Sequence, residues 1–187
     1  MIYSLGFSQT NKLNKESKKI KDVYENLIKN PNSEELQKKY IEVFPENVET
    51  FKEVFYPETF DQLYMDSRQY IFELGNLSKT FPDLVGNKLT NLCIGLKKWD
   101  ADAIGYVQHT TMEFANTNYN DFVKITHGLN EKDLNDLVTF LADVENHSAY
   151  KPYQEFMDKL KNHNEVELLT KFKNAKEKRI SKKNHGF

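Results

Sequence analysis

The stretch Gly128–His163, GLNEKDLNDLVTFLADVENHSAYKPYQEFMDKLKNH, decides the predicted fold because it holds two amphipathic helical patterns in succession. The first pattern places apolar residues three or four positions apart, which gathers them on one side of a helix. These apolar positions are Leu134, Leu137, Val138, Leu141 and Val144. Asn130, followed by Asp133, is typical of a helix start, since an Asn side chain can cap free amides and an acid favours the helix dipole. We therefore expect a helix that begins after Asn130.

Polar residues of the same stretch fall on the opposite side of the first helix, where we expect contact with solvent. They are Asp136, Asp143 and His147. The second pattern has apolar groups at Tyr150, Tyr153, Met157 and Leu160. Pro152 is compatible with this helix only in or before its first turn, where no amide donor is required. Two helices with so short a connection are predicted to pack antiparallel, with their apolar stripes facing each other.

Similar stripes recur along the chain, with Pro and Gly residues between them. Examples are the predicted helices at 14–30, 46–55, 80–96, 100–114 and 164–180, the last of which we expect Asn164 to cap. The predicted fold is all-α, with roughly eight to nine short amphipathic helices in an irregular bundle or a short stack of helical hairpins. No alternating pattern of β-branched residues supports strands.

The composition is that of one globular domain. The 187 residues are 39% hydrophobic and 29% charged, and 13 Phe and 10 Tyr supply bulky core material. We expect a single helical domain at 14–180 and a flexible basic tail at 181–187. No apolar run approaches the roughly 20 residues needed to cross a bilayer.

The first residues, MIYSLGFSQTNK, are a short apolar stretch followed by small and polar residues. Residues 1–13, and Met1 to Ser8 in particular, resemble the cleavage end of a bacterial secretory signal peptide, which would leave Gln9 at the new N-terminus. A complete signal carries a basic region before its apolar core, and here no Lys or Arg precedes Lys12. The alternative is an ordinary apolar segment that docks on the body. A periplasmic or secreted location and a cytoplasmic one both remain open.

Charge is distributed unevenly along the chain. The whole chain carries −2, residues 1–21 carry +4 and residues 171–187 carry +6, which leaves −12 for residues 22–170. An acidic body disfavours nucleic acid and favours a cationic partner. Only Arg68 and Arg179 offer guanidinium groups, which also disfavours specific nucleic-acid readout. The alternative is that the charge serves solubility alone.

Residues able to bind a metal or carry out catalysis occur without a recognised motif. His109 with Glu113, and Asp143 with His147, are spaced i, i+4 and so could each offer two metal ligands, but zinc sites need three or four. Pairs at this spacing are common on solvated helix faces, so we predict neither a metal site nor a cofactor. Cys93, the only cysteine, lies in an apolar segment and is expected to be a buried, unreactive thiol.

Three functions fit these observations, and the first is preferred. It is non-catalytic protein recognition through an acidic surface, for example by an immunity protein that neutralises a basic toxin. The candidate binding residues are Glu46, Glu49, Glu53, Trp99, Asp136, Asp143, His147 and Tyr150. The second is a metal-dependent helical enzyme that uses His109, Glu113, Asp143 and His147. The third is a structural or envelope protein of a bacterium, and the oligomeric state is open in every case.

Overall fold

The computed structural model describes residues 13–56, 61–96, 102–144 and 146–184, with side chains up to residue 181. Within these ranges the chain forms ten α-helices and two short 3₁₀ helices, and no strand. The all-α prediction is confirmed, although the helices outnumber the eight or nine expected. None of the helices in the described ranges is long and apolar enough to cross a membrane.

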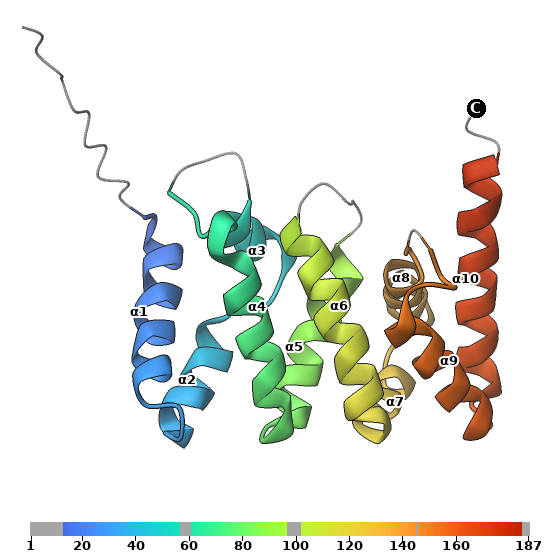
Figure 1. Cartoon of the computed structure of the whole chain (residues 1–187), viewed down its shortest axis with the longest axis horizontal. Helices are drawn as coiled ribbons and strands as arrows, with labels where there is room; N and C mark the ends of the chain where they lie inside the picture. The colour runs from blue at the N-terminus through green and yellow to red at the C-terminus, as the bar shows by residue number, and fades with distance from the viewer. Residues whose placement is uncertain (1–12, 57–60, 97–101, 145, 185–187) are drawn as a thin grey trace, which may run out of the picture.

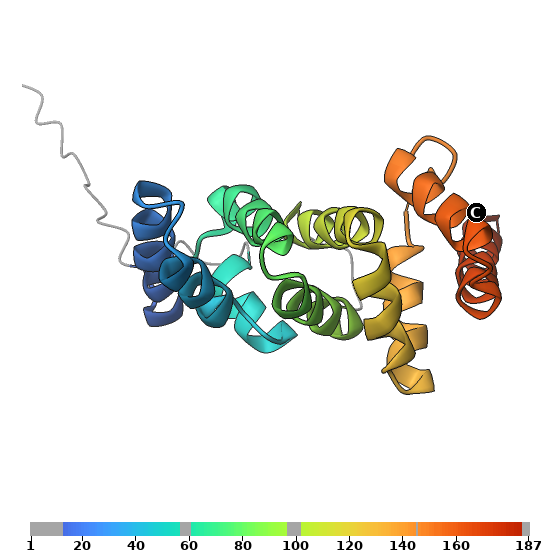
Figure 2. The same ribbon diagram turned by 90° about the horizontal axis from the view of Figure 1, so that it is seen from below.

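The helices form two layers along the long axis of the molecule (Figures 1 and 2). The elements are α1 Lys15–Lys29, α2 Glu34–Val43, α3 Val48–Phe55, η1 Tyr64–Asp66, α4 Ser67–Asn76, η2 Leu77–Lys79, α5 Pro82–Gly95, α6 Asp102–Thr117, α7 Tyr119–His127, α8 Glu131–Leu141, α9 Lys151–Asn162 and α10 Val166–Asn184. One layer, here called the α4 layer, contains α1, α4, α6 and α9. The α5 layer contains α2, α5, α8 and α10, so the architecture is a short stack of helical pairs.

The predicted hairpin of the stretch 128–163 is wrong in its pairing, although both of its helices form. α8 packs against α5, α6 and α10, whereas α9 packs against α6 and α10. The two helices therefore belong to different layers. The physical reason is that α8 ends at Leu141, before the predicted Val144, and the connection at 142–150 lets the chain cross from the α5 layer to the α4 layer.

Asparagine and serine side chains define several helix starts. Asn14, Ser33, Asn47 and Asn130 each accept a hydrogen bond from the amide three residues later, which satisfies a donor that has no partner within the helix. The cap predicted at Asn130 is confirmed.

The cap predicted at Asn164 is wrong, because this residue ends α9 instead of starting α10. Asn164 has φ 57°, a left-handed conformation that Asn tolerates better than most residues. The amide of Glu165 then donates to the carbonyl of Leu160 at 2.9 Å, as in a Schellman motif.

α6 is the most deeply enclosed helix of the α4 layer, with ten of its sixteen residues buried. It contacts α4, α5, α7, α8 and α9. Glycines let two neighbouring helices approach α6 closely: a Cβ atom at Gly86 of α5 would collide with the ring of Phe114, and one at Gly75 of α4 would collide with Thr110. Close packing on both sides therefore fixes the position of α6.

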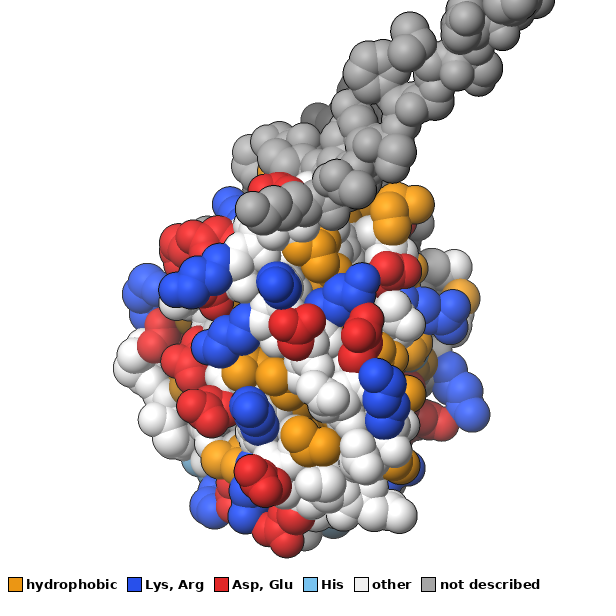
Figure 3. All heavy atoms as spheres, turned by 90° about the vertical axis from the view of Figure 1, so that its left-hand side faces the viewer, with side chains coloured by type: hydrophobic (Ala, Val, Ile, Leu, Met, Phe, Trp, Pro, Cys, Tyr) orange, Lys and Arg blue, Asp and Glu red, His pale blue; other side chains and the backbone are white. Residues whose placement is uncertain are grey.

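The end of the molecule formed by α1 and α2 carries charges of both signs. Figure 3 shows Lys and acidic side chains interspersed over this face, with hydrophobic side chains between them. Lys21 pairs with Glu25 at 3.8 Å, and Lys38 pairs with Glu34 at 2.6 Å. The excess of positive charge in the N-terminal sequence therefore does not form a continuous basic patch on this face.

A buried amine joins α5 to the C-terminal end of α2. Lys88 is only 8% exposed, and its Nζ donates to the carbonyl of Phe44 at 2.8 Å and pairs with Glu46 at 3.2 Å. The carbonyl of Glu42 lies 3.4 Å away. Burial lowers the pKa of Lys88, while Glu46 opposes the shift by hydrogen bonding and by charge. The amine therefore satisfies two carbonyls at the C-terminal end of α2. The dipole of that helix also favours a cation at this end.

Replacing Lys88 with Met keeps the aliphatic stem but removes the donor. We expect Lys88→Met to lower the free energy of unfolding by about 1–3 kcal/mol, the cost of leaving buried acceptors without a partner. Chemical denaturation measures it. Lys38→Met, which removes an exposed amine, serves as the control and is expected to change stability by less than about 0.5 kcal/mol. Equal effects of the two substitutions would contradict a structural role for the buried amine.

Candidate functional site

Half-buried aromatic rings form a continuous row across the α4 layer. The row consists of Phe72 on α4, Tyr106 and His109 on α6, and Tyr150 at the start of α9. The ring centroids of Phe72 lie 5.7 Å from Tyr106 and 5.8 Å from His109, and His109 lies 6.1 Å from Tyr150. We call these four residues the aromatic row.

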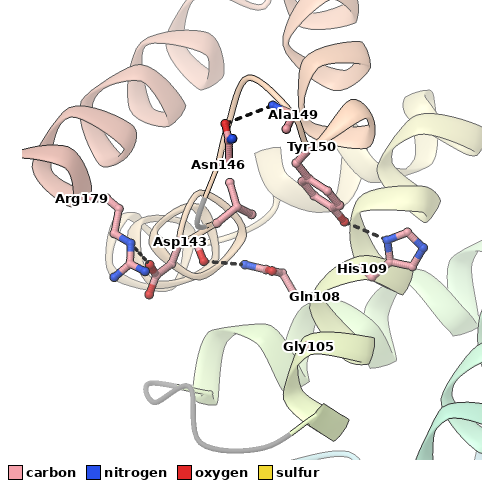
Figure 4. A pocket seen from close by; sticks show the side chains of 9 residues that line it. Gly105, Gln108, His109, Asp143, Asn146, Ala149, Tyr150 and Arg179 are labelled. Carbon is pink, nitrogen blue, oxygen red and sulfur yellow. Dashed lines mark hydrogen bonds and ion pairs between the residues drawn. The ribbon is translucent and has the colours of Figure 1, made fainter. Parts of the chain in front are cut away.

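The aromatic row is held by polar contacts at both of its ends. The guanidinium of Arg68 lies over the Phe72 ring, 5.2 Å from its centroid, as in a cation–π contact. At the other end the hydroxyl of Tyr150 lies 2.9 Å from Nδ1 of His109 (Figure 4). Burial raises the pKa of Tyr150, and the charge of Glu113 raises it further, so the hydroxyl keeps its proton at neutral pH.

Three carboxylates on α4, on α6 and on the 3₁₀ helix before α4 make no ion pair in the described part of the chain. They are Asp66, Glu73 and Glu113. Glu73 accepts one hydrogen bond, from Asn76. Burial and then the charges of Glu73 and Asp66 raise the pKa of Tyr24 on α1. The α4 layer thus combines rings with free negative charge.

Two cavities open beside the aromatic row, and His109 lines both. The smaller, of about 250 Å³, lies between α4 and α6 and includes Phe72 and Glu113 in its wall. The larger, of about 440 Å³, lies between α6, the connection at 142–150 and α10. Its lining residues are Gly105, Gln108, His109, Asp143, Val144, Asn146, Ala149, Tyr150 and Arg179 (Figure 4).

Hydrogen bonds from α6 and an ion pair from α10 hold the connection at 142–150 in place around the larger cavity. Nε2 of Gln108 donates to the carbonyls of Phe140 at 2.6 Å and Asp143 at 3.3 Å. Oδ1 of Asp143 lies 2.5 Å from Nε of Arg179. Both atoms are hidden from solvent. The cavity wall is therefore fixed by groups from three separate elements.

The acidic residues predicted from the sequence around 46–55 do not form one helix face. Glu46 precedes α3 and is engaged by Lys88, whereas Glu49 and Glu53 lie exposed on α3 itself. Glu49 lines a separate cavity of about 500 Å³ between α3 and the end of α5. The structure therefore keeps two of the three acids available on α3 and gives Glu46 a structural partner.

The other predicted binding residues are dispersed. Asp136 on α8 pairs with Lys132 at 2.9 Å, and Asp143 pairs with Arg179, so both have intramolecular partners. Tyr150 belongs to the aromatic row. Trp99 lies outside the described residues.

The prediction that His147 lies on a solvated helix face is wrong. α8 ends before it, and the side chain is only 6% exposed. Its Nε2 donates to the carbonyl of Ala142 at 2.8 Å, and its ring packs edge-on against Tyr153 at 4.9 Å. The i, i+4 spacing from Asp143 does not place the two side chains on one helix face, because both residues lie in the connection that follows α8.

The four residues considered for a metal do not converge. His109 and Asp143 line the larger cavity, Glu113 lines only the smaller one, and His147 bonds a backbone carbonyl. Within the described residues no three His, Cys, Asp or Glu side chains are grouped as metal ligands. The geometry offers no support for the metal-enzyme alternative.

Cys93 is fully buried, as predicted, and its thiol lies 3.2 Å from Oγ1 of Thr111. Burial raises the pKa of this thiol to about 12, against which the hydrogen bond acts weakly. A thiol that stays protonated and has no access to solvent is a poor nucleophile.

Sequence reasoning missed the aromatic row, because Phe72 and Tyr106 were not assigned to any site. The signal was present: both lie beside the apolar stripe of their own helix instead of on it. An aromatic residue next to the buried stripe is exposed at its edge. Only the packing of α4 against α6 shows that the two residues meet.

Comparisons with known proteins find no match: no protein-family description, no curated protein and no solved structure corresponds to the chain.

Protonation of His147 should weaken the fold. Burial lowers the pKa of His147 below its ordinary 6.5, and the nearby charges of Lys176 and Arg179 lower it further, against the hydrogen bond to Ala142 and the charge of Asp143. The unfolded chain therefore takes up the proton more readily than the native one. The contribution of neutral His147 to the free energy of unfolding is complete above about pH 6.5. It falls as the pH drops below this value, by at most about 1.4 kcal/mol per pH unit.

The measurement is the unfolding free energy at pH 7.5 and pH 5.5 for the wild type and for His147→Gln, whose amide nitrogen can keep the bond to Ala142 without titrating. We expect the wild type to lose more stability than the variant over this range. Equal losses would show that other groups account for the pH dependence.

A chelator should leave the melting temperature unchanged if His109, Glu113, Asp143 and His147 have the roles described above. A bound metal stabilises the native state, and its removal lowers the melting temperature. Differential scanning calorimetry with and without EDTA, together with elemental analysis of the purified protein, tests this. One zinc, iron or manganese per chain would contradict it.

Proposed function

We propose that the protein is a non-catalytic recognition module that binds a cationic segment of a partner protein along the aromatic row. The observation that carries the proposal is the row itself: four half-buried rings in mutual contact that run across three successive helices of one layer. Aromatic side chains supply a disproportionate share of binding energy at protein interfaces. Stacked helical pairs commonly present such extended binding surfaces.

The charge of this surface favours a basic partner. Glu113 lines the smaller cavity with Phe72, and Glu73 follows Phe72 on α4. Neither acid makes an ion pair among the described residues, and the body from residue 22 to 170 carries −12. Lys and Arg side chains can pair with such carboxylates and lie over the faces of aromatic rings. The position of Arg68 over Phe72 is an intramolecular example of that contact.

A long-range acidic field would also accelerate the encounter with a basic protein, since opposite charges steer association. A basic toxin is one partner of this class. We therefore keep, as a more specific version of the proposal, the immunity role expected from the sequence, in which the protein neutralises such a toxin.

The partner can be found by site-specific photocrosslinking in the source cells. A crosslinking amino acid at Phe72 or Tyr106 is expected to capture the partner, whereas the same group at Leu84, an exposed apolar residue on α5, is not. Capture from Leu84 alone would place the interface on the α5 layer and contradict the proposal.

Association of the purified partner then tests both rings and charge. Tyr106→Ala should weaken binding by more than about 1 kcal/mol, as is typical of an interface aromatic, while Leu84→Ala should not. The double substitution of Glu73 and Glu113 to Lys should slow association at low salt, and the difference should shrink as the Debye length falls from about 10 Å at 0.1 M to about 3 Å at 1 M salt.

The matched control reverses Glu49 and Glu53 to Lys, which changes the net charge equally but on α3. Glu46 is left unchanged, because a Lys there would face the buried amine of Lys88. If the α3 variant slows association more than the α4–α6 variant, the binding surface is the acidic edge of α3. If neither variant responds to salt, the acidic body serves solubility.

A further inference from the structure

The larger cavity has the size and lining of a ligand site. Its volume of about 440 Å³ falls within the range of roughly 300–1,000 Å³ in which proteins hold small molecules. Gly105 on α6, Val144 and Ala149 in the connection, and the ring of Tyr150 form apolar parts of its wall (Figure 4). An occupant with an apolar body is therefore favoured along this wall.

Two polar side chains of the cavity wall leave donors free. Oδ1 of Asn146 accepts from Oγ of Ser148 at 2.7 Å and from the amide of Ala149 at 3.2 Å, which turns its Nδ2 donor away from these contacts. Arg179 uses its Nε for Asp143. The terminal nitrogens of Arg179 and Nδ2 of Asn146 have no hydrogen-bond partner within the described residues.

Two cations of α10 act on the connection beside the cavity. The positive charges of Lys176 and Arg179 both disfavour protonation of His147, which lies in the same connection, and Asp143 opposes them only in part. The negative charge of Glu113 acts on Tyr150. The guanidinium of Arg179 is therefore the one cation among the described residues that line this cavity.

We propose that the larger cavity binds an amphipathic carboxylate, with the carboxylate at the terminal nitrogens of Arg179 and the apolar body against Val144, Ala149 and Tyr150. A carboxylate accepts hydrogen bonds only, so it matches free donors, and guanidinium nitrogens are its preferred partners. The site does not rest on the recognition of a protein partner by the aromatic row, although Tyr150 and His109 belong to both.

The test uses three probes that share one apolar body and differ in the head group: 1-naphthylacetate, 2-(1-naphthyl)ethylamine and 2-(1-naphthyl)ethanol. Binding to the full chain is measured by isothermal titration calorimetry and by shifts of backbone amide NMR signals. We expect saturable binding of the carboxylate, with shifted amide signals from the connection at 142–150. The amine and the alcohol are expected to bind at least about tenfold more weakly.

Two variants locate the head group and the body. Arg179→Gln should weaken carboxylate binding about tenfold and bring its affinity close to that of the alcohol. Lys173→Gln removes the same charge from an exposed position of α10 outside the cavity wall and should have a much smaller effect. Ala149→Leu, at an exposed position of the connection, narrows the cavity and should weaken all three probes.

Because Arg179→Gln also removes the partner of Asp143, melting temperatures of the variants are measured in parallel. Ala149→Leu keeps the ion pair and so tests the site even if Arg179→Gln is destabilised. The proposal is overturned if the amine binds as well as the carboxylate, if Lys173→Gln and Arg179→Gln weaken binding equally, or if no probe binds saturably.

Discussion

The burial of α6 along most of its length is the constraint on which the rest of the structure depends. A helix with ten of sixteen residues buried must be covered from nearly all sides, and here α4, α5, α7, α8 and α9 cover it. Two polar side chains of α6 that are drawn into this contact donate to backbone carbonyls: Gln108 bonds the end of α8, and Asn116 bonds the carbonyl of Pro152 at 2.8 Å. Helices of both layers thus pack against α6. Its residue His109 lines both cavities beside the aromatic row.

The two proposed binding regions differ in charge because the stack separates charge along its length. Carboxylates without ion pairs in the described part lie on α4 and α6 with the rings, whereas the cations of α10 lie at the far end of the stack (Figure 1). One chain can therefore offer a ring-lined surface with carboxylates to a cationic segment, and a cavity with a guanidinium in its wall to an anion. A net charge of −2 conceals this separation. In the larger cavity Asp143 already has an intramolecular partner, which leaves the terminal nitrogens of Arg179 as donors for the proposed anion.

Local features of the fold could be predicted from the sequence, whereas the pairing of helices could not. The stripe from Leu134 to Leu141 and the Asn130 cap depend on neighbouring residues and were correct. The partners of α8 depend on the path of the connection after Leu141, which periodicity does not encode. For the same reason His147 was expected in solvent, and Asn164 was assigned to the wrong helix end, since an Asn side chain suits both an N-cap and a left-handed terminus. Of the candidate site, only Tyr150 was identified for the aromatic row.

The hydrogen bond between His109 and Tyr150 has a consequence for how the protein is made. Phe72, Tyr106 and His109 leave the ribosome before Tyr150 and the last two helices, and the first three can assemble from contacts already synthesised between α4 and α6. The fourth ring arrives only when α9 docks on α6. The proposed binding surface is therefore complete only once α9 has docked, and a chain cut before α9 would lack the fourth ring of the row and the α10 wall of the larger cavity.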